Sequence, residues 1–570
     1  MKSISDHQTE CSSSHTSHIS QLTSQVKIHA KSSNMSETAL SKRIIIKSIK
    51  KRGLSIESKA CAAIQNVLSR ESPHQQQEKL DLLLSNIKKK PNTAIITTSL
   101  LSEIVASMTQ SEEDIMDESM ELLQSFYTPR LYYDDMRKCF TLEEASKKSL
   151  YGNANVKIEM MRQRYIMIQQ RVLRQDFFRK KLVPSTNAEM KSSQPLTSVD
   201  ALLGRSGVHY LLGYITQVEE GRYYLEDLTG HIPISLDKVE VLSDGYITEN
   251  CIVVVEGEMT DEEVFQVHKI GHPPPESRND AISIIGTTKS DLFGVLKTKA
   301  EIQNVRQAEI LHGINGMFVV VSDVHLDNAT VMEKLECMFQ GFENVNPLPV
   351  FILFGNFMSK PYNTTPDCRM EYMGCFDDLC SLILKYPNIA NNARFVIIPG
   401  PSDPSSSGNI YPKSPIPSTF TQSLRTKIPH ILFGTNPCRI RYFSKEILLF
   451  RNDIVSSLKY HCLVPPRNHD KKDVDLKHAI QTIMDQGHLS PLPLTSTPIY
   501  WNYDHAMRIY PLPDALILGV DRLGQYYDSY CESDVIVPGS FPDEFNFVVY
   551  RPVVDGDGDI KSDVEFSQID

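Results

Sequence analysis

The chain has 570 residues, of which 41% are hydrophobic and 23% are charged, and its formal net charge is −11. At roughly 150 residues per domain this length allows three or four folded units. The composition is typical of globular proteins and excludes a collagenous, wholly disordered or membrane-spanning chain, since the longest apolar stretches, such as 348–354, are only as long as a strand. Because the net charge is negative, any contact with nucleic acid would have to be local.

The N-terminal part divides into a polar tail and a basic helical domain. Residues 1–36 are rich in Ser, Thr, His and Gln and lack the apolar core of a signal peptide, so they are expected to be a disordered tail. In residues 37–110, apolar positions such as Ile45 and Ile49 recur with helical spacing and predict a four-helix domain. Between 40 and 108 there are 12 basic and 5 acidic residues, a balance of +7. This surface could face a partner or could simply be a solvated helical face.

Residues 111–190 are predicted to form a polar connector and one long helix. Helix starts are expected at Ser111 and at Thr141, which has Glu144 three residues later as in a capping box. The long helix is expected from Asn155 to Phe178. Its apolar stripe consists of Ile158, Met161, Tyr165, Ile168 and Val172 and predicts a packing face rather than a coiled coil. Its arginines are expected to point outward or towards the acidic domain that follows: Arg162, Arg164, Arg171 and Arg174.

Residues 191–285 change to a period of two and predict a small barrel. Short strands are expected at 210–218, 223–226, 232–236 and 251–256, separated by turns such as Glu220-Gly221. Strands of this number and length are typical of an OB-fold, which often binds single strands of nucleic acid. Residues 205–272, however, contain 4 basic and 13 acidic residues, a balance of −9. This charge favours a role in protein interaction over binding of phosphates.

Residues 286–314 are predicted to connect the barrel to a layered α/β domain at 315–555. Apolar strands are expected at 317–322, 350–354 and 394–398, alternating with helices around 331–339 and 373–384. A hairpin of the segments 439–443 and 446–450 makes the predicted sheet mixed. The eleven cysteines form no CxxC pair and no zinc-like cluster, so free thiols are expected.

Polar residues at the strand ends of this domain are the candidate functional site, because ligands usually bind at the carboxyl ends of strands. The ends read Ser322-Asp-Val-His325, Gly355-Asn-Phe-Met-Ser359 and Pro399-Gly-Pro-Ser-Asp403. Downstream follow Gly487-His488 and a strand at 515–518 that ends Gly519-Val-Asp-Arg522. This order resembles the calcineurin-like metallophosphoesterases, in which carboxylates and imidazoles hold two catalytic metals.

The resemblance implies that most of the metal ligands have been lost. Asp323, His325 and His488 keep side chains that could bind a metal. The other expected ligand positions hold residues that cannot do so: Asn356, Ser359, Pro401, Ser402, Val520 and Arg522. Since a two-metal site cannot be assembled, no catalytic residue, metal or cofactor is expected. The two remaining histidines are better interpreted as hydrogen-bonded or surface residues than as ligands.

An acidic barrel followed by a degenerate phosphoesterase domain resembles the B subunits of replicative DNA polymerases. The segments 317–327, 351–357 and 394–404 are similar to the epsilon members of that family, as are 435–440, 486–493, 498–501 and 538–542. This resemblance implies an N-terminal domain like the small helical lid of AAA+ ATPases. It also implies a nuclear, non-catalytic subunit that binds the C-terminal domain of the catalytic subunit, the replicative helicase and GINS assembly and small histone-fold subunits, with only weak or indirect contact to DNA.

One alternative function and one further segment remain. The alternative is a metal-dependent phosphoesterase with an unusual ligand set centred on Asp323, His325 and His488. The segment is 556–570, which is expected to be an acidic, flexible tail. The run Asp555-Gly-Asp-Gly-Asp559 is similar to a calcium loop, but Ile560 stands where that loop needs glycine.

Overall fold

A computed structural model describes most of the chain from residue 119 onward and a few segments before it. The described residues are 42–51, 55–56, 60–61, 64, 80, 95–96, 119–146, 148–178, 194–202, 204–237, 239–294, 299–314, 316–467, 474–521, 523–556 and 559–569. They belong to two compact units that meet in the sequence between Ser119 and Met120. Within these ranges no helix is both long enough and apolar enough to cross a membrane.

The first unit is described only in part. Helix α2 (Lys42–Lys51) buries Ile45 and Ile49, which confirms the helical spacing predicted there. Two short strands, β1 (Ser55–Ile56) and β2 (Ile95–Ile96), pair in parallel and were not predicted. The other predicted helices and the tail at 1–36 lie wholly or mainly outside the described residues, so the resemblance to an AAA+ lid stays a prediction.

The acidic segment of the second unit is a closed barrel, as predicted. The strand order is β11-β6-β7-β8-β12-β9, and a direct β11–β12 pairing closes the barrel. The bounds are β6 (Val208–Glu219), β7 (Arg222–Glu226), β8 (His231–Ser235), β9 (Glu240–Val241), β11 (Ile252–Met259) and β12 (Phe265–Gly271). Gly257 lies at the bulge between β11 and β12, where a Cβ atom would come within 2.1 Å of the carbonyl oxygen of Gln266. Only glycine permits this close approach.

The α/β part of the second unit contains two six-stranded sheets. The first has the order β16-β15-β14-β13-β23-β24 and comprises β13 (Phe318–Val321), β14 (Val350–Phe354), β15 (Arg394–Ile398), β16 (Ile431–Phe433), β23 (Asn546–Gly556) and β24 (Asp559–Gln568). The second has the order β21-β22-β20-β18-β17-β3 and comprises β3 (Met120–Gln124), β17 (Cys438–Tyr442), β18 (Lys445–Arg451), β20 (Ala515–Gly519), β21 (Tyr526–Tyr530) and β22 (Ser533–Val537). The ring of Phe318 in the first sheet packs edge to face against the ring of Tyr442 in the second, with the two centroids 5.3 Å apart. The predicted alternation of strands and helices and the hairpin β17–β18 are confirmed.

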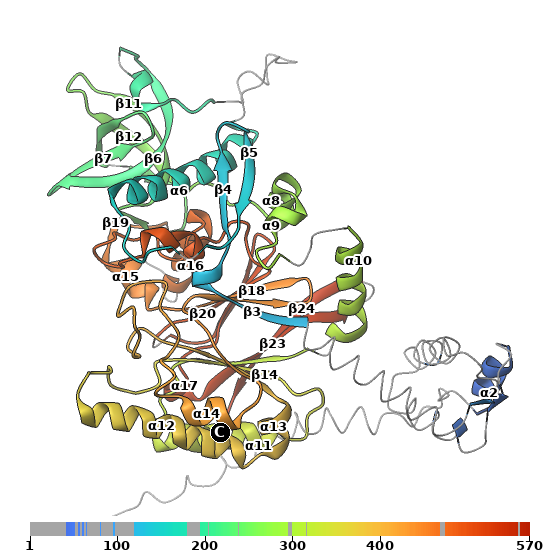
Figure 1. Ribbon diagram of the computed structural model, residues 1–570. Coiled ribbons are helices and arrows are strands. Elements are labelled where there is room, and N and C mark those ends of the chain that lie inside the picture. Colours follow the sequence, from blue (N-terminus) through green and yellow to red (C-terminus); the bar gives the residue numbers. More distant parts are fainter. Residues whose placement is uncertain are drawn as a thin grey trace, which may run out of the picture. The chain divides into compact units, whose positions relative to one another are not determined.

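Helices cover the outer faces of both sheets (Figure 1). The first sheet is covered by α11 (Ala329–Phe342), α12 (Pro366–Leu384), α13 (Pro387–Asn392) and α14 (Gln422–Lys427). The second is covered by α15 (Ile454–Tyr460) and α16 (Asp475–Gln486). Helix α12 starts seven residues before the predicted 373, because Thr365 caps it through Cys368 N and Pro366 fits the first turn.

The region predicted as a polar connector contains strands instead. β3 pairs antiparallel with β17 and completes the second sheet. β4 (Arg130–Asp134) and β5 (Cys139–Glu143) form a hairpin, so the helix start predicted at Thr141 is wrong. The sequence did not predict β3, because apolar and polar residues alternate only weakly along it and its partner strand β17 lies more than 300 residues away. The predicted connector at 286–314 contains helices as well, namely α9 (Thr287–Ser290), α10 (Lys299–Ala308) and the π-helix η3 (Glu309–Gly313). Another helix, α8 (Arg278–Ile285), lies at the end of the range predicted for the barrel.

Helix α6 (Ala154–Arg174) is the predicted long helix, but two predictions about its faces are wrong. Tyr165, Ile168 and Val172 pack against the barrel residues Leu212, Tyr214 and Ile252, as expected of a packing stripe. Ile158, however, is 65% exposed. Arg164 and Arg171, expected to point outward or towards the acidic barrel, are buried.

The reason for that burial is that α6 lies between the barrel and the α/β part. Arg164 pairs with Asp504 in the middle of the 3₁₀ helix η4 (Trp501–Met507). Arg171 donates to the backbone carbonyls of Asp485 and Pro273. The two arginines are seven positions apart and so lie on the same side of the helix. There they find buried acceptors on neighbouring segments, which the sequence pattern could not reveal.

The segment predicted as a flexible acidic tail is in fact a sheet strand. β24 pairs with β23 in an antiparallel hairpin, and Arg551 pairs with both Asp563 and Glu565 across it. Ile569 is buried and its backbone N–H donates to the carbonyl of Phe545. The acidic residues alternate with apolar ones in β24, and this alternation is the signal of a strand that the charge had obscured.

Candidate functional site

Three parallel strands of the first sheet bring the candidate residues together. β13, β14 and β15 are paired in register, with Val321 opposite Leu353 and Leu353 opposite Ile397. The carboxyl ends of these strands therefore meet at one edge of the sheet, and the loops that follow them carry Asp323, Asn356 and Ser402. Asn356 connects the other two residues, because its backbone N–H donates to Asp323 Oδ1 at 3.4 Å and its Oδ1 accepts from Ser402 N.

A buried arginine pairs with Asp323, the first of the candidate strand-end residues. Arg451, at the end of β18, has no exposed surface, and Asp323 is only 1% exposed. The guanidinium Nε donates to Asp323 Oδ1 at 3.2 Å and to the carbonyl oxygen of Gly355 at 3.0 Å. Its Nη1 donates to Asp453 Oδ1 at 2.5 Å. The carboxylate is thus neutralised by a fixed cation that belongs to the chain itself.

A second buried cation lies beside the third strand end. The ammonium group of Lys413, 1% exposed, donates to the carbonyl oxygens of Gly400 at 2.7 Å and Pro401 at 2.6 Å. Burial lowers the pKa of Lys413 to about 8, against the opposing attraction of Asp403. The carboxylate of Asp403 accepts hydrogen bonds from Gly400 N at 2.7 Å, from Phe357 N at 2.9 Å and from the hydroxyl of Tyr372 at 3.0 Å. These hydrogen bonds hold the loops in place and occupy the carboxylate of Asp403.

The other candidate positions are used for loop contacts or for the core. Asn356 Oδ1 accepts from Ser402 N at 2.8 Å, and Ser359 bonds to Asp327 through both its backbone N–H and its hydroxyl. Val520 is 2% exposed and belongs to the core of the second sheet. His325 is half-buried, and its backbone N–H donates to the carbonyl of Asp323 at 2.8 Å. Arg522 lies outside the described residues.

His488 is placed in another environment, between α16 and η4. Its Nδ1 accepts from Ser490 N at 3.0 Å, so its Nε2 carries the proton and faces Asp504 Oδ1 at 3.3 Å. Burial, reinforced by the nearby charge of Arg164, lowers the pKa of His488 to about 4. Burial would raise the pKa of Asp504, but the guanidinium groups of Arg164 and Arg508 outweigh burial and hold it well below its usual range. His488 is therefore a neutral, fully engaged structural side chain.

The residues present do not fit a two-metal centre. In the part of the chain that the structure describes, no group of three or more His, Cys, Asp or Glu side chains could hold a metal ion. Asp323 is paired with Arg451, and His488 is paired with Asp504. Sequence reasoning selected the strand-end residues but missed Arg451 and Lys413, because neither residue lies in the motifs that it compared.

Comparisons with known proteins agree with this architecture. Residues 318–526 match the family model of the B subunits of DNA polymerases alpha and epsilon, and residues 154–274 match "DNA polymerase epsilon subunit 2-like, OB-fold domain". The B subunit of DNA polymerase epsilon from Arabidopsis thaliana is 34% identical over 91% of this chain and 98% of its own length. DNA polymerase epsilon subunit 2 of Homo sapiens is 34% identical over 89% of this chain and 96% of its own length.

Among solved structures, Vps29 of Chaetomium thermophilum covers 44% of this chain and 94% of its own length at 12% identity. Its TM-score of 0.20 is too low to support an inference. The family models place the chain in the class of B subunits of DNA polymerases. Within that class, the chain belongs to the family of the second, or B, subunits of DNA polymerase epsilon, as the sequence resemblance had indicated.

Proposed function

We propose that this chain is a non-catalytic accessory subunit of nuclear DNA polymerase epsilon. The observation that carries this proposal is the pairing of Asp323 with Arg451 in a fully buried position. A side chain that already carries a positive charge stands against the carboxylate that would otherwise bind a metal, and it cannot release a proton to make way for one. Membership of the family supports the assignment to the epsilon complex.

The second unit acts in this proposal as a rigid platform for the C-terminal domain of the catalytic subunit. Support comes from α6, which packs against the barrel through Tyr165 and pairs with the α/β part through Arg164. Buried contacts on both sides make a fixed arrangement of barrel and sheets. The negative charge of the barrel favours a protein partner over DNA. The basic N-terminal unit would contact the replicative helicase and GINS assembly. The small histone-fold subunits would be further members of the same holoenzyme.

The proposal is tested by two independent measurements. The first is co-purification of the full chain with the C-terminal domain of the epsilon catalytic subunit, for which a stable complex is expected. The second is hydrolysis of bis-p-nitrophenyl phosphate with Mn²⁺, Mg²⁺ or Zn²⁺, for which no turnover is expected. Failure of co-purification would contradict the assembly role alone.

The second measurement decides between this proposal and the alternative, a phosphoesterase centred on Asp323, His325 and His488. Metal-dependent turnover that Asp323→Ala abolishes would favour the alternative. A matched control is Asp327→Ala, because Asp327 bonds only to Ser359 among the described contacts and lies outside the proposed ligand set. Turnover that survives Asp323→Ala would point to a contaminating enzyme and would leave the non-catalytic assignment supported.

A further inference from the structure

A groove lies between α6 and the barrel of the second unit. Its volume is about 200 Å³. Three side chains spaced four positions apart on α6, those of Tyr165, Gln169 and Leu173, form one side of it. Residues 196–198 and the turn between β7 and β8, with Leu228 and Thr229, border the rest. The groove therefore follows the helix that joins the barrel to the α/β part.

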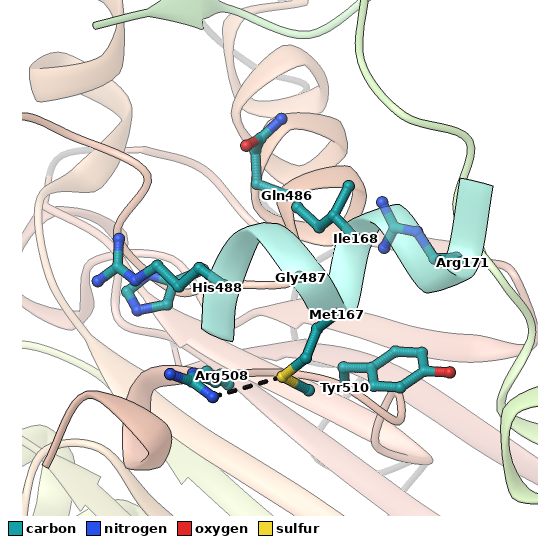
Figure 2. A pocket seen from close by; sticks show the side chains of 9 residues that line it. Met167, Ile168, Arg171, Gln486, Gly487, His488, Arg508 and Tyr510 are labelled. Atoms are coloured by element: carbon teal, nitrogen blue, oxygen red, sulfur yellow. Dashed lines mark hydrogen bonds between the residues drawn. The ribbon is translucent and has the colours of Figure 1, made fainter. Parts of the chain in front are cut away.

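The groove side of α6 is turned away from the α/β part. Met167 contacts the α/β part, where its sulfur accepts from Arg508 (Figure 2). Two positions along a helix correspond to a rotation of about 200°, so Gln169 lies nearly opposite Met167. Among the described residues that line the groove, none belongs to the α/β part. The contacts that fix α6 on the α/β part thus leave the groove uncovered.

Apolar side chains at this groove are partly exposed. Leu173 is 37% exposed and Leu228 is 49% exposed. Phe177, just after α6, is 43% exposed, and its ring lies 4.9 Å from that of Phe178, which lines the groove. Single exposed apolar residues are common on protein surfaces, but several of them beside one groove are typical of an interaction site. The groove is therefore suited to an apolar side chain of a partner.

The turn that carries Leu228 is held by its own hydrogen bonds. Asp227 Oδ1 accepts from Thr229 N at 2.7 Å and from Gly230 N at 3.0 Å, and its Oδ2 accepts from Val199 N at 2.9 Å. A turn fixed in this way loses little conformational freedom when a partner binds. Leu228 is therefore a preorganised contact.

The charges at the groove are negative. Asp227 lines it, and Asp200 lies beside it, because the backbone N–H of Asp200 donates to the hydroxyl of Thr229 at 3.2 Å. No lysine or arginine is found among the described residues that line the groove. Residues 205–272 as a whole contain 4 basic and 13 acidic residues. A nucleic acid would be repelled here, whereas a lysine or arginine of a protein partner would be attracted.

We propose that this groove binds a segment of the C-terminal domain of the catalytic subunit that carries an apolar side chain next to a lysine or arginine. The apolar side chain would lie between Leu173 and Leu228, and the basic one would pair with Asp200 or Asp227. The inference rests on the proposed function, in which the second unit is the part that binds the catalytic subunit. It adds where on the second unit the contact is made and which chemistry the partner brings.

The first test is calorimetric titration of the full chain with the purified C-terminal domain of the epsilon catalytic subunit. Leu228→Asn is expected to raise the dissociation constant about tenfold, because it removes an apolar contact from the groove. Leu242→Asn is the matched control, since Leu242 is a leucine of the same barrel, is 48% exposed and does not line the groove. Equal constants for all three proteins would overturn the groove and leave the proposed function intact. Absence of binding by the unsubstituted chain would overturn both.

A second pair of variants tests the charge. Asp200→Lys should weaken binding of the same domain, because it places a positive charge where the partner brings one. Glu220→Lys makes the same change of charge at an exposed position in the turn between β6 and β7 and should leave binding unchanged. Equal effects of the two substitutions would overturn the proposal.

A photo-crosslinking amino acid in place of Leu228 identifies what occupies the groove in the assembled complex. The expected product joins this position to a peptide of the catalytic subunit in which an apolar residue adjoins a lysine or arginine. Cross-links only to a second copy of this chain, or only to another segment of the same chain, would overturn the proposal.

Discussion

At the level of one residue, Arg451 shows how the loops at the strand ends can be held together by a side chain of the protein itself. Its guanidinium bonds to Asp323, Asp453 and the carbonyl of Gly355, so it holds together loops that follow different strands. A cation of the chain can satisfy the same carboxylate that a metal would, and it does so permanently. The cost is that two buried charges now depend on each other.

Arg451→Met is therefore expected to destabilise the chain by about 3–5 kcal/mol, because it leaves the carboxylate of Asp323 buried without its partner. The matched control is Arg551→Met, which breaks a more exposed pair with Asp563 and should cost less than about 1 kcal/mol. Melting temperatures measured by calorimetry would show the difference. Adding Asp323→Asn to Arg451→Met should restore part of the loss; a double variant no better than the single one would contradict this account.

His488 leads to a prediction about acid. Its pKa is about 4 in the folded chain, whereas an unfolded histidine has a pKa near 6.5. Between these values the unfolded chain binds more protons, so stability that is present above about pH 6.5 is lost as the pH falls towards 4, by up to about 1.4 kcal/mol per pH unit for this group. His488→Gln should flatten the fall of melting temperature in this window. His430→Gln, at an exposed position, should leave it unchanged; an equal effect of both would exclude His488 as the cause.

The sequence places Asn356, Pro401 and Val520 at positions where the resemblance to metallophosphoesterases would require metal ligands. The pairing of Asp323 with Arg451 could not be predicted, because the two residues lie 128 positions apart and only the fold brings them together. For helices too, contacts between residues far apart in the sequence could not be predicted. Tyr165 and Val172 follow the helical period and were assigned to a packing face, but Arg171 has the polarity of a surface residue and is buried by a segment 314 positions away.

Helix α6 is predicted to depend on one of its faces only. Ile168 is 5% exposed and packs among barrel residues, so Ile168→Asp would bury an unpaired charge and should cost on the order of 3 kcal/mol. Ile158→Asp is the matched control on the same helix, because Ile158 is 65% exposed and its replacement should change stability by less than about 0.5 kcal/mol. Thermal melting of both variants checks the prediction. Equal shifts in melting temperature would show that Ile168 is not packed against the barrel as it is in the structure.

The hairpin of β23 and β24 gives a second prediction for an element. A chain that stops at Gly556 loses β24 and leaves β23 as an uncovered edge strand with unpaired backbone groups. We expect it to melt at a lower temperature and to aggregate in size-exclusion chromatography. Substituting Asp563 and Glu565 by Asn and Gln keeps β24 and removes only the charges that pair with Arg551 at the surface, so it serves as the control. If the shortened chain behaved like the full one, the segment would be the flexible tail that its acidity had indicated.

For the whole molecule, the two compact units predict where the chain can be cut. Their division falls between Ser119 and Met120, and β3 starts at Met120 and forms the edge of the second sheet beside β17. Removing residues 1–118 should therefore leave a folded chain that still binds the C-terminal domain of the epsilon catalytic subunit.

Removing residues 1–129 is the matched comparison, since it takes only eleven more residues but deletes β3 and the buried hydrogen bonds of Ser125 to Thr435 and Pro437. We expect this second chain to melt several degrees lower, because the sheet edge at β17 loses its partner and exposes Ile440 and Tyr442, which are buried in the full chain. Calorimetry and pull-down with the catalytic C-terminal domain would measure both properties. Loss of folding already on removal of residues 1–118 would mean that the N-terminal unit is part of the platform rather than an attachment to it.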